Sequence, residues 1–206
     1  MQSDSKHEGN AFKLQGKRCE IAICRTGKRR RGCVKKEDLL PGNPVRISNQ
    51  NNLTLDGAGS TFIMKAYAAD VVFIESSSNI TLKNFKATHI EPEGPIGCTG
   101  SVIQVYGNEN VTIENCQLNG SGIIGVVAYD TKNLKISGNH IYNNSKYGIL
   151  YQGDGTLEIV NNTFENNGER GDDHVGKALD PGLGRVEKIG MGTNEEGLKM
   201  SKNTIK

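Results

Sequence analysis

An eight-residue pattern recurs in this chain and sets the strongest limit on its fold. The octapeptide LKISGNHI at 134–141 is followed 23 residues later by LEIVNNTF at 157–164, with apolar residues and an asparagine in the same places. Five segments match when they are aligned on the first two apolar residues, and successive copies start 27, 31, 23 and 23 residues apart: Leu53 and Leu55, Ile80 and Leu82, Val111 and Ile113, Leu134 and Ile136, Leu157 and Ile159. Such a period is typical of solenoids, in which each repeat forms one coil.

A second apolar pair stands eight residues upstream in each of the last four copies. Its members are Val72 and Ile74, Ile103 and Val105, Val126 and Ala128, Ile149 and Tyr151. Alternation with period two, β-branched residues and flanking glycine or asparagine predict strands. Each repeat is therefore expected to contain a strand, a polar turn, a second strand, an asparagine corner and a short third strand.

The octapeptide also matches the core of the leucine-rich repeat, Leu-x-Leu-x-x-Asn-x-Leu. That fold requires a helical segment on the far side of each repeat, where this chain has NNSKYG, NGSGIIG and NNGERG. These stretches are dense in helix breakers and lead into another strand pattern. We therefore predict an all-β chain that forms a right-handed parallel β-helix of about five coils, with irregular N- and C-terminal extensions.

The asparagine of the octapeptide has a structural interpretation. We expect Asn139 and Asn162 to take the left-handed backbone conformation that a sharp corner needs. Their amides should also hydrogen-bond to each other as a ladder, at about the 4.8 Å strand spacing. Phe85 and Cys116 hold this place in earlier coils, so we expect the ladder only in the last two copies.

These patterns divide the chain into three parts. Residues 37–168 are the predicted β-helix, residues 1–36 a basic N-terminal extension or cap, and residues 169–206 a Gly-rich tail or cap in which the repeat is lost. The first part contains Cys19, Cys24 and Cys33, whose spacing fits no zinc pattern. For the basic stretch around them we favour a solvated linker.

Composition excludes several classes of partner. With 25 basic and 23 acidic residues the net charge is +2, which does not favour nucleic acid as a partner of the whole protein. No stretch has the length of a membrane span, and residues 1–16 lack the apolar core of a signal peptide. We expect no cofactor and no metal.

The repeat Gly-Ile/Val, then Asn-Ile/Val/Leu-x-Ile/Leu-x-x-Asn-x-Ile/Phe, covers about residues 45–168. It resembles the β-helix repeat of pectate-lyase-like and related bacterial proteins. The segments NITLKNFKATHIEPEGPIGCTGSVI and NVTIENCQLNGSG resemble more closely bacterial right-handed β-helix proteins of undefined activity. The resemblance implies an extracellular or cell-surface location. It implies no single activity, because this architecture hosts lyases, hydrolases, epimerases and adhesins.

Outward positions of the predicted strands offer a binding surface. Glu75, Tyr106, Tyr129 and Gln152 should stack in one row, and carbohydrate-active β-helices bind polysaccharide along such a face. We predict that this row binds a polysaccharide or cell-surface glycan. The alternative is that the tyrosines only stabilise the sheet as cross-strand neighbours, in a non-catalytic scaffold or adhesin whose loops meet a protein partner.

A third hypothesis is a diverged polysaccharide lyase, hydrolase or epimerase. The insertion THIEPEGPIGCTG at 88–100 supplies the catalytic candidates His89, Glu91 and Glu93, which could perform acid–base chemistry. For this loop we favour a cap or partner-binding role.

The enzyme patterns of related folds are not matched. Pectate lyases use several aspartates and an arginine on one face. The corresponding face is expected here to offer Glu75 and Asp130, with no arginine in the coils before Arg170. The sequence GDDH at 171–174 lies past the last predicted coil. We therefore place glycan binding first, scaffold second and catalysis third.

Overall fold

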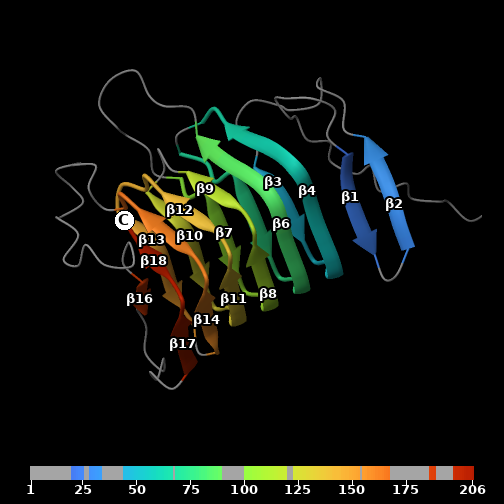
Figure 1. The fold of residues 1–206 in the computed structure, drawn as a ribbon. Coiled ribbons are helices and arrows are strands. Elements are labelled where there is room, and N and C mark those ends of the chain that lie inside the picture. Colours follow the sequence, from blue (N-terminus) through green and yellow to red (C-terminus); the bar gives the residue numbers. More distant parts are fainter. Residues whose placement is uncertain are drawn as a thin grey trace, which may run out of the picture.

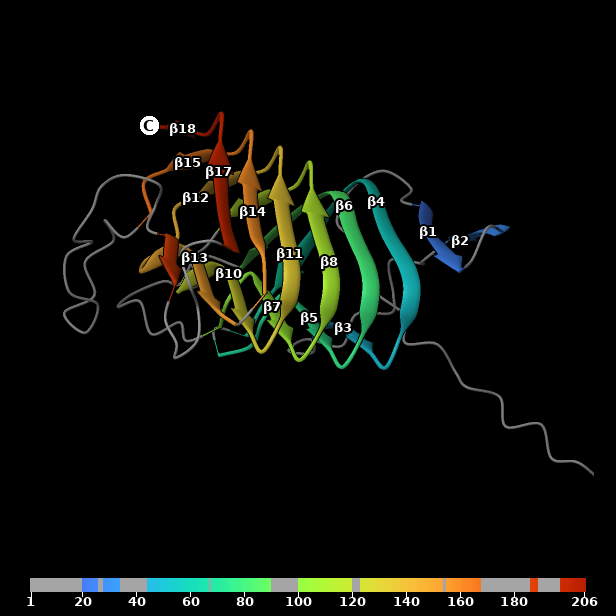
Figure 2. The ribbon, with the colours of Figure 1, turned by 90° about the horizontal axis from the view of Figure 1, so that it is seen from below.

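The computed structural model of the chain describes residues 20–25, 28–33, 44–66, 68–89, 100–119, 123–153, 155–167, 186–188 and 197–206. Within these residues the backbone forms strands and turns and no α-helix. Successive strands stack along one axis, so the chain rises as a series of flattened coils (Figures 1 and 2). The predicted all-β parallel solenoid is confirmed.

One side of every coil belongs to a six-stranded sheet, in which all neighbours are parallel. Its strands are β3 (Val45–Ser48), β5 (Val72–Glu75), β7 (Ile103–Tyr106), β10 (Ile124–Tyr129), β13 (Tyr147–Gln152) and β16 (Val186–Lys188). The upstream apolar pairs of the sequence pattern lie in the middle four strands. Each pair is in register with the next.

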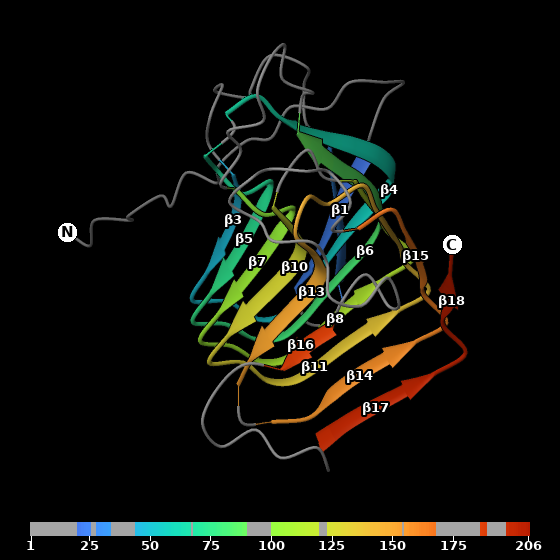
Figure 3. The same cartoon turned by 90° about the vertical axis from the view of Figure 1, so that its left-hand side faces the viewer.

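The rest of every coil belongs to a twelve-stranded sheet that bends at a corner (Figure 3). β4 (Asn51–Met64) and β6 (Ser78–His89) run through this corner. Later coils have one strand before the corner: β8 (Glu109–Glu114), β11 (Lys132–Ser137), β14 (Leu157–Val160) and β17 (Leu198–Ser201). They have a short strand after it: β9 (Gln117–Asn119), β12 (His140–Tyr142), β15 (Thr163–Glu165) and β18 (Thr204–Ile205).

The core is a narrow column of aliphatic residues between the sheets. Each inward position repeats from coil to coil, as in the buried rows Val45, Val72, Ile103, Val126 and Ile149, and Leu55, Leu82, Ile113, Ile136 and Ile159. Burying one such side chain contributes about 1.5–3 kcal/mol. A shift of one residue would turn a whole row outward, so the alternation fixes the register.

Asn139 and Asn162 are buried just after the corner and form a hydrogen-bonded ladder. The Nδ2 of Asn139 donates to the Oδ1 of Asn162 at 3.1 Å, and the Nδ2 of Asn162 donates to the Oδ1 of Asn203 at 3.2 Å. Each oxygen also accepts a backbone N–H from the preceding coil, so the Oδ1 of Asn139 lies 2.9 Å from the N of Cys116. The ladder thus reaches one coil beyond the two expected.

The left-handed backbone of the corner does not lie on the ladder asparagines, and in this respect the prediction was wrong. The positive φ falls on the residue before each of them, at 67° in Gly138 and 56° in Asn161. At the corner, two neighbouring residues therefore have different structural roles. One residue turns the chain, and the next directs its amide into the core.

The repeat is not lost after residue 168, contrary to the sequence prediction. β17 pairs in parallel with β14, and β18 pairs with β15. The sequence LKMSKNTI at 198–205 has the octapeptide pattern, and Asn203 stands 41 residues after Asn162. This coil brings the number of coils in the described residues to six, and a long insertion separates it from the fifth.

A β-hairpin covers the other end of the stack. β1 (Glu20–Arg25) pairs antiparallel with β2 (Lys28–Cys33) and with β4 of the first coil. Figures 1 and 2 show the hairpin beyond β4, at the end opposite β17. These residues are therefore not the solvated linker that we favoured. They fit the predicted N-terminal cap, because a solenoid needs its terminal edge covered. Cys19 lies outside the described residues.

Candidate functional site

The row predicted to bind ligand runs across the outer face of the six-stranded sheet. Glu75 pairs with Tyr106, Tyr106 with Tyr129, and Tyr129 with Gln152, each on the next strand. Ser48 extends the row to β3, where it pairs with Glu75. Neighbouring strands are about 4.8 Å apart, so the four predicted positions span about 14 Å across the sheet.

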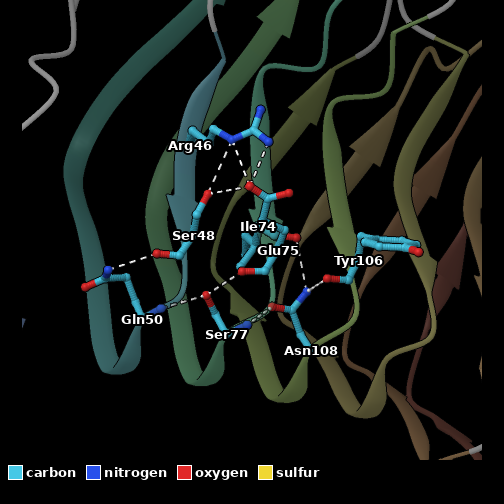
Figure 4. A network of polar contacts seen from close by, with 8 residues as sticks. All are labelled: Arg46, Ser48, Gln50, Ile74, Glu75, Ser77, Tyr106 and Asn108. Atoms are coloured by element: carbon cyan, nitrogen blue, oxygen red, sulfur yellow. Dashed lines mark hydrogen bonds and ion pairs between the residues drawn. The ribbon is translucent and has the colours of Figure 1, made fainter.

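Glu75 is fixed by two side chains of β3 (Figure 4). Its Oε1 accepts hydrogen bonds from the Nη2 of Arg46 at 2.7 Å, the Nε of Arg46 at 3.0 Å and the Oγ of Ser48 at 2.6 Å. The Arg46 guanidinium also lies over the Phe73 ring, 4.6 Å from its centroid. The prediction that this face has no arginine is therefore wrong.

This environment keeps the carboxylate charged. The hydrogen bonds from Ser48 and Arg46 lower the pKa of Glu75 below its ordinary value, and the charge of Arg46 acts in the same direction. All three bonds end on Oε1. Within the described residues Oε2 has no hydrogen-bond partner, so it can accept a bond from a ligand hydroxyl.

The two tyrosines of the row differ in accessibility. Tyr106 is 48% exposed and is one of three large apolar side chains that are exposed in the described part of the chain. Tyr129 is half-buried and packs against an apolar cluster of Ile124, Val127 and Leu150 on the same side of the sheet. Tyr106 is therefore the main aromatic surface, and Tyr129 borders it.

Buried polar side chains hold the turns that follow β5 and β7. Asn108 accepts from the backbone N of Ser77 at 2.9 Å and donates to the carbonyl of Tyr106 at 2.8 Å. The hydroxyl of Ser77 donates to the carbonyl of Glu75 at 2.7 Å. The backbones of Glu75 and Tyr106 are thus both anchored from inside the coil, as Figure 4 shows.

His89, the catalytic candidate that lies within the described residues, does not join this row. His89 ends β6 on the other sheet, is 3% exposed, and donates from Nε2 to the carbonyl of Ala69 at 2.7 Å. Burial lowers its pKa, so the ring is held neutral. Glu91, Glu93 and the GDDH segment at 171–174 lie outside the described residues.

A second polar cluster, which the sequence patterns did not indicate, lies on β12 and β15. The Nε2 of His140 is 2.9 Å from the Oε2 of Glu165, and the Tyr142 ring stacks on His140 at 4.2 Å. Both members of the pair are about one-third exposed. No group of three His, Cys, Asp or Glu side chains in the described residues is placed to hold a metal ion.

Sequence reasoning missed Arg46 and Ser48, although a signal for them exists. The segment VRIS at 45–48 aligns with VFIE at 72–75, 27 residues on, as the first two copies of the octapeptide pattern also do. The first coil therefore had an upstream strand like the others. Extending the alignment by one copy would have placed Arg46 beside Phe73, and Ser48 beside Glu75.

The comparisons with known proteins agree with this architecture. No curated protein and no solved structure matches the chain significantly. No helix of the described residues has the length and hydrophobicity that crossing a membrane requires. The family described as the right-handed beta helix region matches residues 41–179, which is 139 of 206 residues and includes the whole row from Arg46 to Gln152. The chain belongs to the right-handed β-helix family.

Proposed function

We propose that this protein is a surface or secreted module that binds polysaccharide along the outer face of its six-stranded sheet. The observation that carries the proposal is the exposed Tyr106 ring beside the fixed carboxylate of Glu75. A sugar ring offers an apolar face and a rim of hydroxyls. An exposed aromatic ring and a hydrogen-bond acceptor on the next strand are complementary to these two surfaces.

Rigidity supports binding by this face. Glu75 and Tyr106 sit on parallel strands whose turns are anchored by Asn108 and Ser77. Side chains that are already ordered lose little conformational entropy when a ligand arrives. The row also continues over four adjacent strands, which suits a polymer better than a single small molecule.

Catalysis is less well supported by the described residues. Acid–base chemistry on a glycan needs proton-transfer groups within reach of one bond. Glu75 is engaged with Arg46, whereas His89 is buried on the other sheet. The paired His140 and Glu165 lie on a different face, on β12 and β15.

The proposal is tested by measuring polysaccharide binding to the purified chain with a glycan array and affinity electrophoresis. Tyr106→Ala should weaken binding at least about tenfold, as loss of a central aromatic contact commonly does. Tyr142→Ala is the matched control, because it removes the same ring from a strand of the other sheet. If no glycan binds, the proposal fails and the scaffold or adhesin hypothesis takes its place. Release of shorter sugar chains from a bound polymer would favour the enzyme hypothesis.

A further inference from the structure

We infer that the ligand of this face is an uncharged polysaccharide and not a polyuronate or other acidic glycan. The inference rests on the proposed function and narrows it to one class of ligand. It follows from how the charges of the six-stranded sheet are paired and where they lie.

The five strands from β3 to β13 contain two charged residues, Arg46 and Glu75. They lie on adjacent strands and form an ion pair at 2.7 Å, so the binding row carries no net charge from them. Asp130 directly follows β10 and adds a negative charge beside the row. β16, at the end of the sheet, contributes one residue of each sign in its sequence, Glu187 and Lys188.

Among the described residues, an acidic sugar would find no free cation on the strands beside Tyr106. The guanidinium of Arg46 directs Nε and Nη2 to the Oε1 of Glu75 and packs on Phe73. A ligand carboxylate would have to displace Glu75 from this pair or lie next to its open Oε2. A ligand carboxylate next to Oε2 would be repelled by the carboxylate of Glu75, and this repulsion selects against acidic ligands.

Two cations lie near one end of the row. Lys132 begins β11 of the other sheet three residues after Tyr129, and Lys188 on β16 pairs with Tyr151, which precedes Gln152. A third cation, Lys146, is remote. Lys146 precedes β13 and lies over the Tyr147 ring, 5.2 Å from its centroid. It is six residues from Gln152 along an extended strand, which corresponds to about 20 Å. That distance is about twice the Debye length at 0.1 M salt, so Lys146 is screened from a ligand on the row.

The polar side chains of the row are well suited to hydrogen-bond the hydroxyls of a neutral sugar. The Oε2 of Glu75 is a charged acceptor for a sugar O–H, and the exposed amide of Gln152 can both donate and accept. Between them lie the two tyrosine rings, one strand apart. Four successive positions therefore present acceptor, ring, ring and amide, with the strand spacing close to the length of one pyranose residue.

The test compares neutral polymers (a β-glucan, a mannan and a xylan) with acidic ones (polygalacturonate, alginate and hyaluronate) by isothermal titration calorimetry. We expect at least one neutral polymer to bind, to lose affinity in Tyr106→Ala, and to bind equally at low and high salt. An acidic polymer that binds while the neutral ones do not, and that is lost in Tyr106→Ala, would overturn this inference and leave the proposed function standing. No binding by either class would overturn the proposed function itself.

A variant that frees the guanidinium of Arg46 tests whether its pairing with Glu75 is what excludes acidic ligands. Glu75→Gln frees the guanidinium of Arg46, so acidic polymers should now bind with salt-sensitive affinity. Neutral polymers should bind about five- to tenfold more weakly, because a charged acceptor is replaced by a neutral one. Glu158→Gln is the matched control, since it releases Lys135 from a comparable ion pair of 3.1 Å on the other sheet. If Glu75→Gln rejects acidic polymers as the wild type does, the charge argument is wrong.

Discussion

Replacing Asn162 with leucine should destabilise the solenoid by about 3 kcal/mol without changing its outer face. The Oδ1 of Asn162 accepts from the backbone N and from the Nδ2 of Asn139, at 2.9 and 3.1 Å. Leucine leaves both N–H groups without this acceptor in a buried place. Each orphaned donor costs about 1–3 kcal/mol. The extra apolar surface of leucine offsets on the order of 1 kcal/mol of this cost.

The same substitution at Asn139 should cost less, and the difference is the sharper test. There the side chain's Oδ1 accepts only one N–H, that of Cys116 at 2.9 Å, so one donor is orphaned and the cost is about 1–3 kcal/mol. Each variant also removes one bond to a backbone carbonyl, that of Ile136 for Asn162 and that of Ile113 for Asn139. This loss cancels in the comparison.

Urea unfolding followed by circular dichroism gives the free energy of unfolding for each variant, provided that the slope with denaturant is unchanged. Lys135→Leu is the control, because it introduces leucine at an exposed position and removes only an exposed ion pair with Glu158, worth about 0–1 kcal/mol. A loss below about 1 kcal/mol for Asn162→Leu, or a larger loss for Asn139→Leu, would refute the ladder argument. Polysaccharide binding by the folded variants should be unchanged.

Four further predictions concern titration and packing. The pKa of Glu75 is lower in the folded protein than its ordinary value of 4.5. The stability that this carboxylate contributes is therefore full above pH 4.5 and is lost as the pH falls further. In acid-unfolding curves, Arg46→Met should shift this loss to higher pH. The pKa of His89 is also lowered in the folded protein, so proton uptake by the unfolded chain should destabilise the fold as the pH falls below 6.5. The wild type should therefore lose more stability between pH 7 and pH 5 than His89→Gln does. Parallel curves of stability against pH for the two proteins would contradict this. Burial raises the pKa of Cys116 to about 12, so peptide mapping at pH 8 should find this thiol unlabelled by iodoacetamide until the protein unfolds. Gly125→Ala should destabilise by about 1–3 kcal/mol in urea unfolding, because the new methyl group would lie 2.6 Å from a carbonyl oxygen of the next coil; an unchanged midpoint would show that the coils separate readily.

The strands and their register could be predicted because they depend on a local rule that repeats. Alternating apolar residues bury one face of a strand, and a fixed spacing places Ile103 above Val72 and Val126 above Ile103. Stacked coils then bring Glu75 and Tyr106 together without any knowledge of loops. The row of the candidate site was predictable for the same reason.

Features that depend on side-chain geometry could not be predicted in this way. The ion pair of Arg46 with Glu75 depends on the rotamers of both side chains, which the register of β3 with β5 does not give. The last coil escaped detection because 41 residues, and not 23, separate Asn203 from Asn162. His89 followed a clear strand pattern, yet its burial against Ala69 depends on the course of β6 beyond the corner.

The position of the polar residues explains why scaffold and binding face can be separated by mutation. Asn162 and Asn139 direct their amides into the coil, where they bond to the backbone and to each other. Glu75 and Tyr106 direct their side chains outward from strands whose carbonyls are held by Ser77 and Asn108. Polar groups inside the coil therefore fix the backbone, and the outward positions remain free to vary in charge and shape. A related coil could take an acidic glycan by exchanging Glu75 alone, because that one carboxylate holds the guanidinium that an acidic ligand would need.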